Sequence, residues 1–285
     1  MTRLAPSIKA LRRYSDPRPL IVSHKGRNSG MVAESTHRAF TLALREGADI
    51  LETDVSRAAG GEMILMHGPN LDRYTDGSGP IQNRSIQELR QLHNRSCNGC
   101  TPDTQILELP DFLAAYKGFC LLNLDRCFTF LPEAYNEVRR QGMTDQVLLK
   151  SGKNLEKAFR WLEAERFQPQ FMPIIDNDPD ALSFVLDTAR RYPYPAVELV
   201  FRSDEDPMVA PQTIERFHSL GIKLWVNALT LSFPLCGGHD DIRSLFDDPA
   251  LGWGWLCDRG FDVIQTDFVR ELKDYLDTRY GRKEE

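Results

Sequence analysis

Residues 50–67 read ILETDVSRAAGGEMILMH and contain two short β-rich runs, at 50–55 and 63–67. Glu52 and Asp54 lie two residues apart in the first run. Because side chains along a strand alternate between its two faces, both carboxylates are expected on the same face. The pattern of strands and helices on either side of this stretch indicates which fold the chain adopts and where that face lies in it.

Strand-like and helical patterns alternate along the whole chain. The β-rich runs are 19–24, 50–55, 63–67, 119–124, 146–150, 171–175, 196–201, 223–227 and 262–266. The main amphipathic stretches are 36–46, 131–141, 155–165, 179–191, 211–220 and 270–280. This alternation predicts parallel βαβ units whose strands are buried on both faces. Nine runs are one more than an eight-stranded barrel needs, so 196–201 or 63–67 is expected to be short or out of register.

A doubly wound open sheet also fits the alternation, but the polar residues favour a barrel. His24 and His67 end the first and third runs, Glu52 and Asp54 lie in the second, and Asp125 follows the fourth. Parallel α/β folds place their sites at the carboxyl ends of the strands. We therefore predict an α/β fold of the (β/α)8 or TIM-barrel class, with these side chains meeting at one end.

The sequence predicts a single domain over residues 1–285. Residues 1–18 form an N-terminal extension, and the long connection 68–116 is expected to be an inserted loop or small subdomain between strands three and four. A connection of that length in a compact domain is typical of a functional lid or rim.

Composition narrows the classes of partner. The 285 residues are 41% hydrophobic and 27% charged, with a formal net charge of −6, so no global positive field favours nucleic acid or anionic lipid. The N-terminus lacks the apolar core of a secretory signal, and no run is long enough for a transmembrane helix. We expect a cytoplasmic protein without stable membrane insertion.

Six scattered cysteines suit a reducing compartment better than a disulfide framework. Cys97 and Cys100 have the spacing of half a zinc site, but no second Cys/His pair follows. We interpret them as loop thiols or a small local disulfide.

Three carboxylates and two histidines carry the predicted chemistry. Two carboxylates as close as Glu52 and Asp54 repel unless a positive group lies between them. A hard divalent cation with oxygen ligands fits, and Asp125 would complete the set; the alternative is that these acids are ordinary strand-end charges paired with lysines. His24 and His67 beside a cation indicate general acid and base catalysis on a phosphate ester.

The remaining ionisable residues near this site are interpreted more simply. Lys25 follows His24 directly and adds a positive charge for a phosphate. The other histidines end no strand-like run and are interpreted as structural; they are His37, His93, His218 and His239.

Several motifs resemble those of glycerophosphodiester phosphodiesterase domains. Residues 23–92 carry SHKG, AEST, LETD, MHG and LDRYTDG in order, similar to His-Arg-Gly, Pro-Glu-Asn-Thr, Glu-Leu-Asp, His-Asp and Leu-Asp-Arg-Thr-Thr-Asn-Gly. GIKLWVNAL at 221–229 is similar to a Trp-Thr-Val-Asn strand, and RGFDVIQTDFVREL at 259–272 resembles a closing Gly-Val-Asp-Gly-Ile-x-Thr-Asp segment. The resemblance is strongest over 20–92 and 221–272.

The resemblance implies a TIM barrel that hydrolyses a phosphodiester. It implies acid and base roles for His24 and His67. It also implies that Mg²⁺ or Ca²⁺ is held by three carboxylates, those of Glu52, Asp54 and Asp125. Glu34 would lie close to the site, and Trp225 would form part of the wall that packs against the substrate.

The chain departs from the family at four of these positions. Lys25 replaces an Arg, Gly68 replaces the Asp after the second His, and Asp125 replaces a longer Glu. Cys127 stands where the family has a Lys, and Lys150 at the end of the next strand is a candidate replacement for that charge near the phosphate.

These departures leave three functions open. The first is hydrolysis of a glycerophosphodiester-like or sugar phosphodiester, a small-molecule substrate. The second is phosphoryl transfer to a hydroxyl, as in the related agrocinopine synthase and sphingomyelinase D branches. The third is a barrel that binds phosphorylated ligands without turnover. The alcohol groups, the choice between Mg²⁺ and Ca²⁺, and the oligomeric state stay open at this point.

Overall fold

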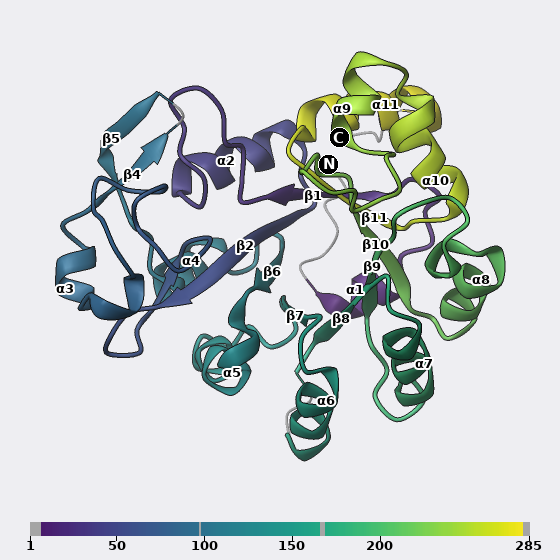
Figure 1. The fold of residues 1–285 in the computed structure, drawn as a ribbon, viewed down its shortest axis with the longest axis horizontal. Coiled ribbons are helices and arrows are strands. Elements are labelled where there is room, and N and C mark those ends of the chain that lie inside the picture. Colours follow the sequence, from purple (N-terminus) through teal and green to yellow (C-terminus); the bar gives the residue numbers. More distant parts are fainter. Residues whose placement is uncertain (1–6, 97, 166–168, 282–285) are drawn as a thin grey trace.

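Eight parallel strands form a closed barrel in the computed structural model, which describes residues 7–96, 98–165 and 169–281 (Figure 1). The strands in chain order are β1 (Leu20–His24), β2 (Ile50–Arg57), β6 (Leu121–Asp125), β7 (Val147–Ser151), β8 (Phe171–Asp176), β9 (Ala196–Val200), β10 (Lys223–Asn227) and β11 (Val263–Thr266). The first strand, β1, pairs with both β2 and β11, and this pairing closes the barrel. The predicted (β/α)8 fold is confirmed.

One of the nine predicted strands, the run 63–67, lies outside the barrel. β3 (Met63–Leu65) runs antiparallel to the last residues of β2, with Val55 opposite Leu65. An antiparallel partner joined by a short turn cannot be a member of the parallel ladder, which needs a long crossover. The run 196–201 is the full barrel strand β9, so 63–67 is the surplus run. The insertion follows the run 63–67, as predicted, and that run lies after the second barrel strand without joining the barrel.

The inserted segment forms a small layer beside the barrel opening, to the left in Figure 1. It contains η1 (Ile81–Asn83), α3 (Ile86–Leu89) and a two-stranded sheet of β4 (His93–Ser96) and β5 (Gly99–Gln105). Ile64, Leu71, Ile81 and Leu89 belong to its separate apolar cluster. The next helix, α4 (Leu109–Tyr116), packs instead into the main core of the barrel. Cys97 and the side chain of Cys100 are outside the described residues.

Helices surround the barrel. They are α2 (His37–Glu46), α5 (Leu131–Arg140), α6 (Leu155–Ala164), α7 (Pro179–Thr188), α8 (Pro211–Ser219), α9 (Asp241–Phe246), α10 (Trp255–Arg259) and α11 (Val269–Tyr280). Short turns add η2 (Cys127–Thr129), η3 (Pro207–Val209) and the π-helical η4 (Ala250–Gly254). Thr36 caps α2 by accepting a hydrogen bond from the Ala39 N–H, and left-handed Gly47 ends it. No helix among the described residues is long and apolar enough to cross a membrane.

The N-terminal segment closes the amino-terminal end of the barrel. Ile8 and Leu11 of α1 (Ile8–Arg12) are fully buried against the first residues of the strands, including Leu20 and Val263. Because α1 fills that end, the opposite end, where the strands finish, is left for polar side chains.

Candidate active site

Strand register brings the three predicted carboxylates together at the carboxyl end of the barrel. Asp54 of β2 lies opposite Asp125 of β6, and His24 of β1 lies opposite Glu52. One oxygen from each of Glu52, Asp54 and Asp125 lies within 4.8 Å of the others. Glu52 and Asp54 are almost completely buried, whereas Asp125 is half-buried at the opening.

This acidic triad (Glu52, Asp54 and Asp125) has the properties of a site for a hard cation. Asp54 Oδ2 is buried and accepts no hydrogen bond. Burial raises the pKa of Glu52 to about 7, and the negative charge of Asp54 acts in the same direction. An unsatisfied buried oxygen within a cluster of carboxylates fits a divalent ion such as Mg²⁺ or Ca²⁺, which takes oxygen ligands.

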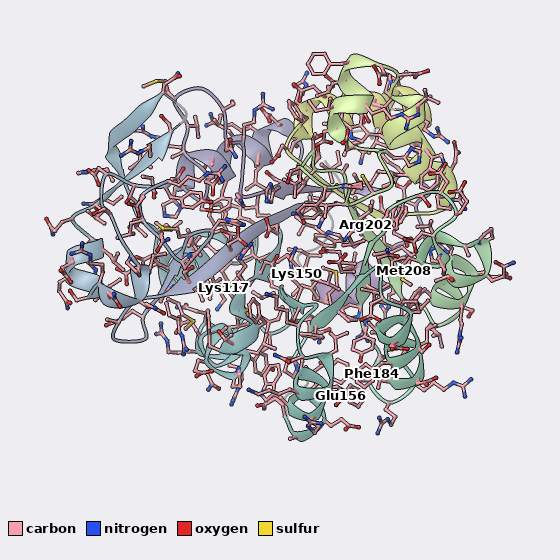
Figure 2. All side chains as sticks on the ribbon, viewed as in Figure 1. Lys117, Lys150, Glu156, Phe184, Arg202 and Met208 are labelled. Atoms are coloured by element: carbon pink, nitrogen blue, oxygen red, sulfur yellow. The ribbon has the colours of Figure 1, made fainter. Side chains whose placement is uncertain are left out.

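Lys150 lies inside the barrel (Figure 2), close to two members of the acidic triad, Glu52 and Asp125. Its ammonium is 3.2 Å from Asp125 Oδ2, 3.2 Å from Glu198 Oε2 and 3.9 Å from Glu52 Oε1. Burial lowers the pKa of Lys150, but these carboxylates outweigh it and raise the pKa, so the group stays charged. Lys150 has 1% of its surface exposed, and its ammonium lies among these carboxylates; its contact with a phosphate stays a prediction.

Glu198 of β9, which was not predicted, connects Lys150 of β7 with Asn227 of β10. Its second carboxylate oxygen accepts a hydrogen bond from Asn227 Nδ2 at 2.8 Å. The Trp225 indole N–H donates in turn to Asn227 Oδ1 at 3.3 Å. Trp225 has no exposed surface and packs with Ile8 in the amino-terminal half of the barrel. Trp225 is therefore buried inside the barrel, with its ring 6.0 Å from the Lys150 ammonium, and its place in a substrate wall stays a prediction.

His24 is held by a carboxylate that the sequence did not single out. Its Nδ1 lies 2.8 Å from Oδ1 of Asp267, which follows β11. Burial lowers the pKa of His24, but the hydrogen bond with Asp267 and the charge of Glu52 outweigh it, and the pKa is raised. The buried Asp241 accepts from the Asp267 backbone N–H and from the Thr266 hydroxyl, and so fixes this end of β11.

His67 has a different environment from His24. Its Nδ1 lies 2.9 Å from the Tyr74 hydroxyl, a neutral partner. Burial lowers the pKa of His67 to about 4, against the raising effect of Asp54 and with the help of Lys25. The residue was predicted to end a barrel strand, but it follows the antiparallel β3. That strand runs back toward the barrel, where the Met66 N–H donates to the Asp54 carbonyl at 3.0 Å.

Two further predicted residues, Lys25 and Glu34, form an ion pair next to Asp54 of the acidic triad. The Lys25 ammonium is 3.7 Å from Asp54 Oδ2 and 3.7 Å from Glu34 Oε1. Lys25 and Gly26 both have positive φ, and a Cβ on Gly26 would come within 2.7 Å of Ala39, so the turn requires glycine there. Arg126, also in the left-handed region, places Nε 3.3 Å from Asp54 Oδ1.

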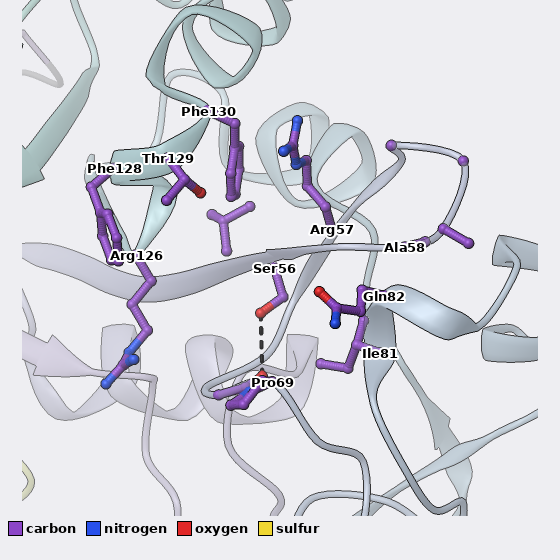
Figure 3. Close-up of a pocket in the computed structure, with 15 residues that line it drawn as sticks. Ser56, Arg57, Ala58, Pro69, Ile81, Gln82, Arg126, Phe128, Thr129 and Phe130 are labelled. Carbon is purple, nitrogen blue, oxygen red and sulfur yellow. Dashed lines mark hydrogen bonds between the residues drawn. The ribbon is translucent and has the colours of Figure 1, made fainter.

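A cavity of about 590 Å³ is lined in part by the residues that directly follow Asp54, His67 and Asp125 in the chain (Figure 3). It is lined by Val55, Ser56, Arg57, Ala58, Ala59, Gly60, Gly61, Gly68, Pro69, Ile81, Gln82, Arg126, Phe128, Thr129 and Phe130. We name it the β2 pocket, since β2 forms its floor beyond the barrel. Its lining includes Gly68, which follows His67, and Arg126, which pairs with Asp54.

Comparison with known proteins agrees with this geometry. Residues 171–276 match a family described only as a domain of unknown function (DUF4996). Glycerophosphodiester phosphodiesterase GDPD6 of Arabidopsis thaliana is 24% identical over 242 residues, which are 81% of this chain and 58% of that protein. The chain spans 63% and 48% of the length of bacterial relatives from Bacillus subtilis and Mycobacterium tuberculosis.

Solved structures show the same fold over nearly the full chain. A glycerophosphoryl diester phosphodiesterase from Parabacteroides distasonis superposes with a TM-score of 0.78 at 17% identity, covering 98% of this chain and 94% of that one. An Oleispira antarctica phosphodiesterase in complex with the product sn-glycerol-3-phosphate gives 0.65 at 18% identity, covering 91% and 97%. The chain is therefore a homologue of the glycerophosphodiester phosphodiesterases and shares their TIM-barrel fold.

Proposed function

We propose that the chain is a metal-dependent phosphodiesterase that cleaves a glycerophosphodiester-like or sugar phosphodiester with His24 and His67 as acid and base. The observation that carries the proposal is the meeting of the acidic triad with two histidines in unlike environments. Names and a product complex among the homologues support the same reaction class. Glu52, Asp54 and Asp125 would hold Mg²⁺ or Ca²⁺, which would offset negative charge on the phosphate oxygens.

The two histidines divide the proton transfers. His67, whose pKa is lowered, is neutral near pH 7 and takes a proton from the attacking water. His24, whose imidazolium is stabilised by Asp267, gives a proton to the oxygen of the leaving alcohol. The water oxygen bonds to phosphorus as the bond from phosphorus to that alcohol breaks, and the products are a phosphomonoester and an alcohol. Lys25 and Arg126 add positive charge beside Asp54.

Chelation is the direct test of metal dependence. We expect protein treated with EDTA to lose activity on bis(p-nitrophenyl) phosphate, and added Mg²⁺ or Ca²⁺ to restore it, because an ion held by the acidic triad would offset the negative charge on the phosphate oxygens. A stopped assay with and without each ion measures this. Full activity in the metal-free protein would contradict the proposal.

Transfer to a hydroxyl uses the same groups as hydrolysis, with an alcohol in place of water. Incubation in ¹⁸O-labelled water followed by mass spectrometry separates the two, since only hydrolysis places the label in the phosphomonoester. Tight binding of a diester without any product would instead indicate a barrel that only binds phosphorylated ligands. The proposed setting is cytoplasmic, and Cys127, Cys236 and Cys257 agree with it, since none of these three thiols is in a disulfide.

The affinity for the cation is expected to rise with pH. Because burial raises the pKa of Glu52 to about 7, this carboxyl is mostly protonated at pH 6 and mostly charged at pH 8. A cation must displace that proton, so its association constant should increase about tenfold over this interval. Isothermal titration calorimetry on metal-free protein measures the change. An affinity that is constant or falls with pH would show that Glu52 is not a ligand, and Glu52→Gln should remove most of the pH dependence.

A further inference from the structure

We infer that the β2 pocket binds one alcohol substituent of the phosphodiester and selects a hydroxyl-rich, uncharged or anionic group over a cationic one. The inference rests on the proposed function and adds the chemical class of the substituent. Three observations carry it: the position of the pocket, the charges that line it and its size.

The pocket is lined by residues that lie next to the proposed site in the chain. Val55 and Ser56 directly follow Asp54 on β2, and Gly68 follows His67, so chain neighbours of both residues line the pocket. Arg126 lines it and also reaches Asp54, at 3.3 Å. A diester whose phosphate lies at the triad therefore has one substituent directed along β2 into this space. Ser56 lies among the lining residues, and its hydroxyl donates to the carbonyl oxygen of Gly68 (Figure 3). The same hydroxyl also lies 3.0 Å from the Met66 carbonyl oxygen.

The lining is positively charged. Arg57 and Arg126 contribute guanidinium groups, and no Asp or Glu is among the described residues that line the pocket. The Arg57 guanidinium lies 4.5 Å above the ring of Phe130, and its partner Glu133 outside the pocket is more than half exposed, so water screens that pair. Outside this lining, the Lys153 ammonium lies 5.0 Å from the ring of Phe128. A quaternary ammonium in the pocket would meet these guanidinium groups and no carboxylate of the lining, since Asp54 and Glu133, the partners of Arg126 and Arg57, are not among the lining residues.

The other lining groups suit hydroxyls. Gln82 and Thr129 are exposed at the pocket and offer an amide and a hydroxyl, which donate and accept hydrogen bonds. Arginine forks donate to hydroxyl, carboxylate or phosphate oxygens. The half-buried ring of Phe128 gives an apolar face against which a sugar-like ring can pack. A volume of about 590 Å³ falls within the usual range for small-molecule sites and accommodates a six-membered polyol.

The test compares two substrates that differ only in this substituent. Metal-loaded protein is assayed with glycerophosphoinositol and with glycerophosphocholine, and kcat and KM are measured for each. We expect kcat/KM to favour the inositol diester by about tenfold or more, mainly through KM, because the lining repels the choline cation. Arg57→Ala should reduce this ratio, and Arg57→Glu should bring it to one or below.

The matched control is Arg160→Glu, which reverses the same charge on an exposed position of α6, outside the lining. It should leave the ratio unchanged, and circular dichroism checks that all variants are folded. Equal kcat/KM for the two diesters in the unmodified protein, or a ratio that Arg57→Glu does not alter, would overturn the inference while leaving phosphodiesterase activity intact. If neither diester nor bis(p-nitrophenyl) phosphate is hydrolysed with Mg²⁺ or Ca²⁺, the proposed function itself fails, and the inference with it.

Discussion

His24→Ala and His67→Ala are each expected to lower kcat by about 10²- to 10⁴-fold, the usual contribution of a general acid or base. Without His67 no neutral base remains beside Asp54 to accept the proton of the attacking water. Without His24 the leaving alkoxide must depart without a proton, and the Asp267 carboxylate loses its partner. Steady-state kinetics on metal-loaded protein measure both effects, and KM should change much less than kcat.

Substrates with different leaving groups distinguish the two roles. The His24→Ala defect should shrink for a p-nitrophenyl ester, whose leaving oxygen needs little protonation, whereas the His67→Ala defect should persist. His93→Ala is the control, since His93 lies in the inserted segment and pairs with Asp76. Activity within a few-fold of the unmodified protein in both His24→Ala and His67→Ala would show that acid and base catalysis lies elsewhere.

Lys150→Met is expected to lower the free energy of unfolding of the metal-free protein by about 3–5 kcal/mol, the range for a buried charge that loses its partner. Lys150 is the buried cation shared by Glu52, Asp125 and Glu198, which would face one another without it. Urea denaturation at pH 8 measures the loss. The deficit should be smaller at pH 5, because the carboxylates can then take up protons.

A second substitution separates charge from packing in this prediction. Glu198→Gln in the Lys150→Met background removes one of the uncompensated carboxylates and should recover part of the lost stability. Lys157→Met, on the exposed face of α6, is the matched control and should change the free energy of unfolding by less than about 0.5 kcal/mol. A Lys150→Met protein as stable as the unmodified one would mean that the buried carboxylates are protonated already.

Much of the barrel could be predicted because its signals are local. Each barrel strand is a short apolar run, and the period of two along β2 is enough to place Glu52 and Asp54 on one face. What the run 63–67 does depends on its partner: Met63–Leu65 extends the end of β2 as an antiparallel strand, and the same apolar pattern would suit a barrel strand. The sequence therefore left open which of the nine runs was the surplus one, and the pairing of 63–65 with β2 identifies it.

The partners of the predicted residues depend on closure of the barrel, which no local pattern specifies. Asp267 lies 243 residues after His24, and only the pairing of β1 with β11 brings them together. Glu198 lies across the barrel interior from Lys150, so the inward direction of both side chains was not apparent from either strand alone. Trp225 was placed by resemblance, and the register of β10 directs it into the core. The Thr-Asp of the closing segment at 259–272 was the one sequence signal for Asp267.

The residues that line the β2 pocket could not be predicted from local sequence patterns either. Its lining comes from the end of β2, from the start of the insertion and from the turn after β6. Arg57 and Arg126 each resemble ordinary surface residues in the sequence. Their shared position arises only because β2 continues past the barrel and the chain after Asp125 turns back through a left-handed residue, Arg126.

A crystal structure of protein loaded with Mn²⁺, with anomalous diffraction recorded at the manganese edge, tests the central claim most directly. The account predicts an anomalous peak bonded to oxygens of Glu52, Asp54 and Asp125 at about 2.0–2.6 Å, with His24 and His67 beside it. A peak at other residues, or none at these three in a protein that requires the ion for turnover, would contradict it.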